Sequence, residues 1–317
     1  MAGIDAALFA NPLWLAPMAG VTEPAFRTLC IEHGAGLTYT EMISAKALEY
    51  ANDKTHDMAL PAPAERKIAI QLFGHEPAVM ARQAQLLAEE MADRIALVDV
   101  NMGCPVPKVC KKGEGSALMG TPKLAAQIVA EMVRALDPYG IPVTAKFRSG
   151  IDDGNLNAVE FARTLEQAGA AALGVHGRTA VQLYRGKSDK RVIKAVADAV
   201  SVPVIGSGDV FTHDDALFMM ADYGAAAVFM ARGARGNPWV FTGHEPSALE
   251  RIAAARRHLE LYIRFHGDAH LSPMRAQLAF YMHGQPGAAS LRRELGVASS
   301  AEDFFALLDA AAERCDD

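Results

Sequence analysis

The chain has 317 residues, enough for one large α/β barrel of about 250 residues and a small second domain. Hydrophobic residues make up 51% and charged residues 21% of the chain, a balance that excludes an intrinsically disordered protein. The formal net charge of −6 argues mildly against a nucleic acid as the partner.

The cysteines and the apolar segments bear on where the protein works. No two of Cys30, Cys104, Cys110 and Cys315 have zinc-finger or CxxC spacing, and free thiols are typical of a reducing compartment. His, Asp and Glu do not cluster at metal-ligand spacing. The N-terminus lacks a basic segment, and no run of 18 apolar residues occurs. We therefore expect a cytoplasmic protein with no metal and no membrane span.

Eight short apolar segments alternate with longer amphipathic ones and predict eight strands. Such apolar runs are typical of parallel strands covered by helices. The predicted strands are Leu13–Pro17, Leu37–Glu41, Ile68–Phe73, Leu97–Asn101, Val143–Phe147, Ala172–His176, Val204–Ser207 and Ala227–Arg232.

Helix signals lie between these strands. Thr22-Glu23-Pro24, Glu76-Pro77 and Thr121-Pro122 each put a proline in the first turn of a helix, and Gly169 and Gly224 can end two later helices. Most strand ends are about 30 residues apart, which is the length of one βα unit. The chain therefore predicts a TIM (β/α)8 barrel, with a doubly wound open sheet as the alternative.

Five predicted strands end in a polar or charged residue after an apolar run. These residues are Gln71, Asn101, Lys146, His176 and Arg232. In a TIM barrel the C-terminal ends of the strands line the active-site mouth. We expect these five side chains to gather there.

The barrel is predicted to span residues 1–242, and a small helical domain residues 243–317. Breaks at Gly267, at 284–287 and at Gly296 divide the second part into three or four short helices. Between Glu245 and Ser300 the chain has seven arginines against five acidic residues, so the local charge weakens the objection to a nucleic acid partner.

The longest interval between predicted strands carries Cys104 in a loop rich in glycine and proline. A thiol with a pKa of about 8.5 is mostly protonated at neutral pH and can donate a proton. The alternative for Cys104 is a small buried hydrophobe, the role that we expect for Cys30 and Cys315.

Lys146 closes the fifth predicted strand. A lysine at the end of an apolar strand must meet an anion or a polarised oxygen. It could stabilise the negative charge of a reduced flavin. A structural salt bridge and a Schiff base with a carbonyl substrate are the alternatives.

Small residues follow the last two strands, in Gly206–Asp209 and in Ala231–Gly236. They expose backbone N–H groups at the corner where TIM barrels commonly bind phosphate, and Arg232 adds a charged donor. The pattern predicts a phosphate-bearing ligand. His176 and Arg178, in the turn after the sixth strand, could hold that ligand or the substrate.

Taken together, these motifs resemble those of the tRNA-dihydrouridine synthases, most closely the bacterial B-type branch. The matching stretches are APMAGVTEPAFR (Ala16–Arg27), QLFG (Gln71–Gly74), VNMGCP (Val100–Pro105), GSALM (Gly115–Met119), VTAKFRSG (Val143–Gly150), VHGRT (Val175–Thr179), GSGD (Gly206–Asp209) and the segment Arg232–Phe241, which ends in NPWVF. They occur in order and span most of the predicted barrel. PGAASLRREL (Pro286–Leu295) resembles the family's C-terminal helical domain.

The resemblance implies FMN as prosthetic group, NADPH as reductant and tRNA as substrate, with uridines of the D-loop reduced to dihydrouridine. It makes Cys104 the proton donor and gives Asn101 a part in holding the uracil. The residues that it implies around FMN are Pro17, Met18, Ala19, Gln71, Lys146, His176, Ser207, Gly208, Asp209, Ala231 and Arg232. Candidates for contacts with tRNA phosphates are Arg178, Lys111, Lys112 and the arginines of the C-terminal helices.

Three positions depart from the family pattern. Ser207 stands where Asn is usual, Ala231 where Gly is usual, and Cys110 where a polar residue, usually Asn, is found. Two other functions stay open. One is an FMN-dependent TIM-barrel oxidoreductase that acts on a small-molecule enone or pyrimidine. The other is a tRNA-binding protein without activity, whose flavin site has decayed at Ser207 and Ala231.

Overall fold

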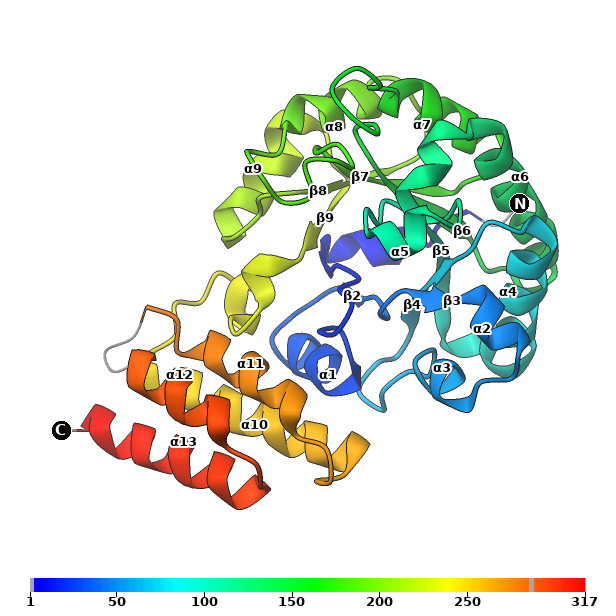
Figure 1. The fold of residues 1–317 in the computed structure, drawn as a ribbon. Helices are drawn as coiled ribbons and strands as arrows, with labels where there is room; N and C mark the ends of the chain where they lie inside the picture. Colours follow the sequence, from blue (N-terminus) through cyan, green and yellow to red (C-terminus); the bar gives the residue numbers. More distant parts are fainter. Residues whose placement is uncertain (1–2, 285–287, 317) are drawn as a thin grey trace.

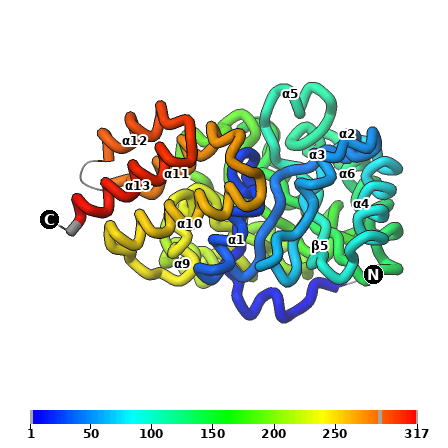
Figure 2. Tube along the Cα trace, turned by 90° about the horizontal axis from the view of Figure 1, so that it is seen from below, coloured from blue at the N-terminus to red at the C-terminus, as the bar shows by residue number. Residues whose placement is uncertain are grey.

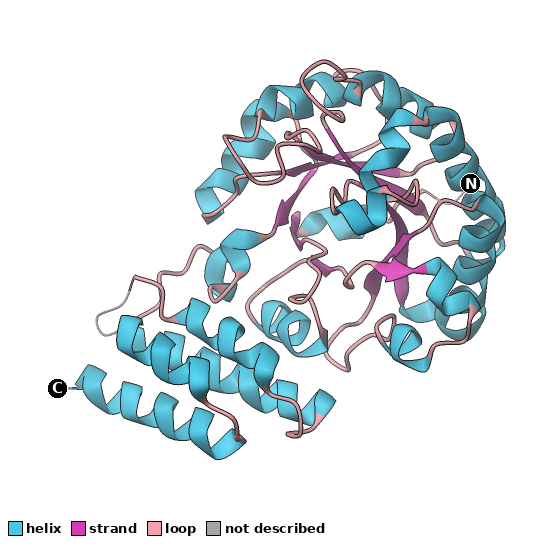
Figure 3. Ribbon diagram, in the orientation of Figure 1, coloured by secondary structure: helices cyan, strands magenta, loops and turns pink. Residues whose placement is uncertain are grey.

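The computed structural model describes residues 3–284 and 288–316. The predicted break at 284–287 and the first two residues of the Pro286–Leu295 stretch lie largely outside these ranges. Nine parallel strands curl into one sheet, with helices around the outside (Figures 1 and 3). The strands are β1 (Leu13–Leu15), β2 (Leu37–Thr38), β3 (Ile43–Ser44), β4 (Ile68–Phe73), β5 (Ile95–Met102), β6 (Val143–Arg148), β7 (Ala172–His176), β8 (Val204–Ser207) and β9 (Ala227–Met230).

The sheet has the order β2-β1-β9-β8-β7-β6-β5-β4-β3, and the TIM-barrel prediction is confirmed. The second predicted strand, Leu37–Glu41, is split into β2 and β3. Tyr39 forms a parallel bridge with Ala69 of β4, which closes the ring between these two pieces. Between the two pieces, the Thr40 hydroxyl accepts the hydrogen bond of Gln71 N at 3.0 Å in place of a main-chain carbonyl.

The helices around the barrel begin where proline signals predict them. Pro24, Pro77 and Pro122 are the first residues of α1, α4 and α6. The helices before the C-terminal part are α1 (Pro24–Glu32), α2 (Ala45–Glu49), α3 (Asp53–Asp57), α4 (Pro77–Met91), α5 (Pro107–Cys110), α6 (Pro122–Leu136), α7 (Ala158–Gln167), α8 (Lys190–Ala197) and α9 (His213–Tyr223). The short helix α5 lies over the C-terminal end of the barrel (Figure 1).

Aromatic side chains fill the barrel from its N-terminal end up to the floor of the mouth, where Phe229 lies. The rings of Trp14 and Phe9 lie 5.3 Å apart, and those of Tyr39 and Phe229 lie 5.0 Å apart. The Trp14 indole donates to the carbonyl of Asn11 at 3.1 Å, which ties the N-terminal segment to this end. The barrel is therefore packed below and opens at the mouth where the strands end.

Four helices follow the barrel: α10 (Ala248–His266), α11 (Ser272–Tyr281), α12 (Ala288–Val297) and α13 (Ala301–Asp316). Their apolar core includes Ala25 and Leu29 of α1, so the bundle packs on that helix (Figure 1).

The domain boundary at 242/243 stays a prediction. Gly296 is the second-last residue of α12, and the helix break predicted there follows at 298–300. Among the described residues, no helix has both the length and the apolar character to span a membrane.

Cys30 is buried as predicted, but the prediction for Cys315 is wrong because its side chain is exposed. Cys315 lies in the last turn of α13, the last helix of the bundle, where its side chain faces solvent. The thiol is within hydrogen-bond distance of the carbonyl of Ala311 at 3.3 Å.

A buried ion pair joins α1 to the segment before β4. Arg27 donates through Nε and Nη2 to the carboxylate of Glu65 at 2.9 and 3.2 Å, and both side chains have at most 1% of their surface exposed. Glu65 also accepts from the main chain of Ala62 at 2.6 Å and from the hydroxyl of Thr38. The pair thus holds β2, α1 and the entry to β4 together.

We expect Glu65→Ala to lower the free energy of unfolding by about 3–5 kcal/mol, because it leaves the Arg27 guanidinium buried without its anion. Urea denaturation measures the change. Asp198→Ala, which breaks the exposed pair with Lys194, is the control and should have almost no effect. Equal losses in the two variants would contradict this account.

Candidate active site

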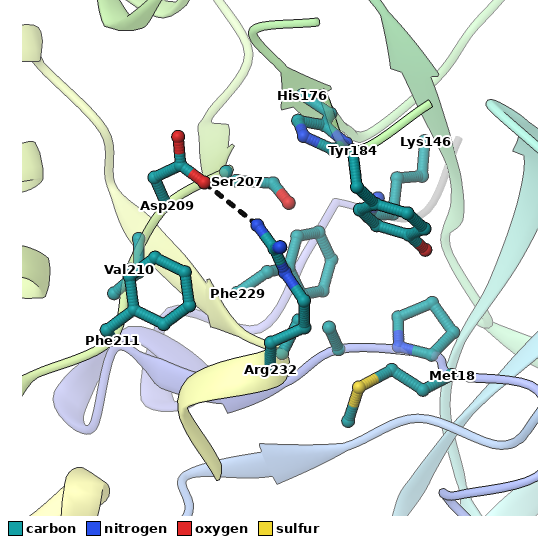
Figure 4. Close-up of a pocket in the computed structure, with 14 residues that line it drawn as sticks. Met18, Lys146, His176, Tyr184, Ser207, Asp209, Val210, Phe211, Phe229 and Arg232 are labelled. Carbon is teal, nitrogen blue, oxygen red and sulfur yellow. Dashed lines mark hydrogen bonds and ion pairs between the residues drawn. The ribbon is translucent and has the colours of Figure 1, made fainter. Parts of the chain in front are cut away.

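A hollow opens at the mouth of the barrel. Its walls come from the ends of β6 to β9 and from the turn after β1 (Figure 4). The lining residues are Ala16, Pro17, Met18, Lys146, His176, Tyr184, Ser207, Gly208, Asp209, Val210, Phe211, Phe229, Ala231 and Arg232.

Nine of the eleven residues expected around FMN line this hollow. The other two do not. Ala19 lies at the exposed tip of the turn after β1, and Gln71 is buried below the mouth with 1% of its surface exposed. Tyr184 and Phe211 line the hollow but were not predicted. The available signal was an aromatic residue a few positions after each of the VHGRT and GSGD turns.

Lys146 brings an ammonium group to the hollow without an anion to match it. The group forms no hydrogen bond or ion pair with any described residue, and it lies 5.5 Å from the centre of the Phe229 ring. Gly174 makes room for its stem, since a Cβ there would lie 3.0 Å from Lys146 Cγ. Burial, reinforced by the nearby Arg148, lowers the pKa of Lys146 to about 8. The site fits a ligand that brings negative charge.

The turn after β8 packs closely on Ser188 and His176. Gly208 has φ of 112°, and a Cβ there would collide with the hydroxyl of Ser188. That hydroxyl is buried and has no hydrogen-bond partner among the described residues. Burial and the surrounding cations, with Lys146 first among them, hold the pKa of His176 well below its usual value, so its ring is neutral.

Asp209 lies between two guanidinium groups. Nη2 of Arg178 is 2.7 and 2.8 Å from its two carboxylate oxygens, and Nη2 of Arg232 is 2.8 Å away (Figure 4). Partial burial opposes ionisation, but the hydrogen bond from Ser188 N and the two arginines hold the pKa of Asp209 below its usual value. Arg178 is 2% exposed. It is therefore not available on the surface to a tRNA phosphate, contrary to what the sequence led us to expect.

Arg232 is held from two further sides. Its guanidinium carbon lies 5.0 Å from the centre of the Tyr184 ring and 5.1 Å from that of Phe211. The two rings and Asp209 fix the direction of the group, while about a third of the side chain stays exposed. Arg232 can thus present its remaining N–H groups to an anion in the hollow.

A chain of hydrogen bonds runs from the barrel interior to Cys104. Asp99 accepts from Gln71 Nε2 at 2.7 Å, and Gln71 Oε1 accepts from Asn101 Nδ2 at 2.7 Å. Asn101 Oδ1 then accepts from the main-chain N–H groups of Gly103 and Cys104 at 3.2 and 2.9 Å. Gln71 and Asn101 therefore hold, from inside the barrel, the start of the loop that carries Cys104.

Cys104 lies partly buried on the loop that α5 carries over the mouth. It does not line the hollow itself, but it is within electrostatic range of Lys146, which does. Burial raises the pKa of the Cys104 thiol above its usual value, so the group is protonated at neutral pH. Arg148, another residue that the sequence reasoning missed, donates to the carbonyl of Gly103 at 2.7 Å and anchors the loop. The arrangement offers a proton donor above a cationic hollow.

Comparison with known proteins agrees with this geometry. A sequence model of the family described as "Dihydrouridine synthase (Dus)" matches residues 14–315. The chain belongs to the dihydrouridine synthase family. Nearly all the secondary structure described above falls within the match, including the C-terminal helices.

Several curated relatives cover most of both chains. The "Probable tRNA-dihydrouridine synthase" of Mycobacterium tuberculosis is 39% identical over 95% of this chain and 82% of its own length. The "Probable tRNA-dihydrouridine synthase 1" of Synechocystis sp. is 38% identical over 93% and 84%. The "tRNA-dihydrouridine synthase B" of Pseudomonas aeruginosa is 37% identical over 90% and 87%.

Among solved structures, a variant of NCR from Zymomonas mobilis is similar in fold. Its TM-score is 0.50, with 18% identity over 72% of this chain and 84% of that chain. At this level of identity the likeness concerns the fold alone.

The ammonium of Lys146 predicts a pH-dependent stability. Its pKa in the folded chain is about 8 against an ordinary value of 10.5, so between these values the unfolded chain binds more protons and stability rises with pH. Lys146→Met should remove this rise, and the variant should be more stable than the original chain near neutral pH. Urea denaturation of both chains, freed of flavin, at about pH 7 and about pH 10 measures the difference. A difference that does not shrink with rising pH would refute the assignment.

Proposed function

We propose that this chain reduces uridines of tRNA to 5,6-dihydrouridine, with FMN as prosthetic group and NADPH as reductant. The observation that carries the proposal is a protonated thiol, Cys104, held over a mouth where the ammonium group of Lys146 has no hydrogen-bonded or ion-paired partner among the described residues. Membership of the dihydrouridine synthase family and the names of the relatives supply the substrate. With tRNA as substrate, we expect the protein to act in the cytoplasm. We expect its target uridines to lie in the D-loop of the tRNA.

The hollow at the mouth is the proposed FMN site. Lys146 would neutralise the charge of the reduced ring system, and Arg232 with the turn at Gly208 would hold the phosphate. The neutral His176 can donate or accept a hydrogen bond beside them. When bound, FMN would supply a hydride for C6 of the uracil, and NADPH would reduce the oxidised flavin again.

Cys104 would supply the proton that completes the reduction. Its S–H bond breaks while a C–H bond forms at C5 of the uracil, and the thiolate left behind regains a proton from solvent. Asn101 keeps the loop in place through the Cys104 N–H. Because the site is recessed in the mouth, the target uridine must leave its stack to enter it, which is cheapest in a loop of the RNA.

Cys104→Ala should keep FMN and still oxidise NADPH, while dihydrouridine formation falls by about 10²–10⁴-fold, the usual contribution of a general acid. The measurement is mass spectrometry of nucleosides from tRNA that lacks dihydrouridine, incubated with enzyme and NADPH. Cys110→Ser is the matched control, since a hydroxyl can replace the Cys110 thiol beside Cys104 O and Ser116 Oγ.

Undiminished uridine turnover in Cys104→Ala would exclude the thiol as proton donor. If a small enone or pyrimidine, and not tRNA, reoxidised the reduced flavin of the original chain, the small-molecule reductase would replace the proposal.

The tRNA contact surface that we propose combines α5 with the bundle of residues 243–317. Lys108, Lys111, Lys112, Arg292 and Arg293 are exposed, and none forms an ion pair with another described residue. Helix α12, which carries the two arginines, lies on the same face of the molecule as α5, the upper one in Figure 2, although the two are apart along it. We call these five residues the mouth-side basic surface. They could follow the RNA backbone while one base enters the mouth.

Replacing both Lys111 and Lys112 by alanine should weaken tRNA binding and flatten its salt dependence by about one to two units of slope, because up to two phosphate contacts are lost. Filter binding over a range of salt concentrations measures both effects. Arg66→Ala with Lys67→Ala removes the same charge before β4, at the opposite end of the barrel, and should leave binding unchanged. Equal effects of the two double variants would count against the mouth-side basic surface.

A further inference from the structure

The turn after β1 lines the candidate flavin site, and its exposed tip, Ala19 and Gly20, receives little support from packing. Pro17 and Met18 line the hollow, and Val21 N and Thr22 N both donate to Met18 O at 3.1 and 3.0 Å. Gly20, at the exposed tip, has φ of 73°, and a Cβ there would meet no described atom within 4 Å. The position of the tip therefore depends on its hydrogen bonds.

Both sides of Gly20 are held by side chains from elsewhere in the molecule. Its N–H donates to Glu41 Oε2 at 2.7 Å, from the segment between β2 and β3. Its carbonyl accepts from Gln277 Nε2 at 3.1 Å, across 257 positions of the chain. Gln277 lies on α11 and is 8% exposed, so water does not easily replace its amide. The bundle thus reaches the edge of the candidate flavin site directly.

A second set of contacts fixes α11 to the start of α1, immediately after this turn. The Tyr281 hydroxyl lies 3.1 Å from His258 Nδ1, and His258 Nε2 lies 3.3 Å from Glu23 Oε1. Glu23 caps α1 by accepting from Ala25 N and Phe26 N at 2.7 and 2.8 Å. Because α11 and α1 are tied together, Gln277 has a fixed place from which to hold the turn.

We propose that Gln277 is a positioning residue for the flavin site, and that the C-terminal bundle completes that site in addition to any contact with tRNA. By fixing Gly20, Gln277 keeps Pro17 and Met18 in the wall of the hollow. This inference rests on the proposed FMN site. It assigns to the bundle a part in cofactor binding that does not involve RNA.

The test is Gln277→Met in the full-length holoenzyme, since methionine matches the length of glutamine and lacks its N–H donor. The affinity for FMN should fall about threefold to tenfold, because the Gly20 carbonyl loses the hydrogen bond that fixes the tip of the turn. Fluorescence titration with FMN measures the affinity. At saturating FMN, the visible circular dichroism of the bound flavin should also change, because the wall beside the ring has moved. Gln277→Glu is the second variant if the first does not fold, and its carboxylate should have the larger effect.

Arg257→Met is the matched control. It cuts another link between the bundle and α1, the ion pair with Glu32 at 2.7 Å, without touching the turn. Its thermal midpoint can fall, but FMN affinity and flavin dichroism should stay unchanged.

A Gln277 variant that folds and keeps both the original affinity and the original dichroism would overturn the inference and leave the proposed function intact. So would equal changes in the Arg257 and Gln277 variants, which would indicate general loosening of the bundle. An original chain that takes up no FMN would instead overturn the proposed cofactor site itself.

Discussion

The direction of one hydrogen-bond chain governs the geometry above the barrel. Burial raises the pKa of Asp99 to about 6, so near neutral pH the carboxylate is ionised and can only accept. Gln71 must therefore turn its amide nitrogen toward Asp99 and its oxygen toward Asn101. Asn101 is left with its oxygen facing the N–H of Cys104. A charge deep in the barrel thus decides which way two amides point and where the loop with the thiol begins.

The cations at the mouth outnumber the anions that could neutralise them. Arg178 and Arg232 share the single carboxylate of Asp209, and Lys146 has no hydrogen-bonded partner among the described residues. A hollow with this imbalance is electrostatically incomplete until a negatively charged ligand enters. The same cations help to keep His176 neutral, whereas it is burial, against the pull of Arg148 and Lys146, that raises the pKa of the Cys104 thiol. The cations therefore prepare the mouth for binding an anion, and burial of the thiol prepares it for donating a proton.

The sequence was sufficient for the barrel and for the strand ends that meet at its mouth, because apolar runs and βα spacing are local signals. It could not give the roles of individual polar groups, which depend on partners far along the chain. The sequence suggests that Arg178 is a free cation, but the structure pairs it with Asp209, 31 positions later. Gln71 reads as a ligand contact until Asp99 is seen to hold its amide. The hold of Gln277 on Gly20 has no sequence signal at all, since neither residue is part of a recognisable pair.

The same difficulty applies to charge counted along the sequence. The net charge of −6 argued against RNA, and the arginines after Glu245 argued for it. In the structure, Arg256 and Arg257 are paired with Asp309 and Glu32 and hold the bundle together. An arginine engaged in this way offers little to a phosphate, because a new contact must first replace the existing one. In the proposed contact with RNA, the charge that matters is the unpaired charge on one face, which the α5 segment with Lys111 and Lys112 and the distant helix α12 would supply together.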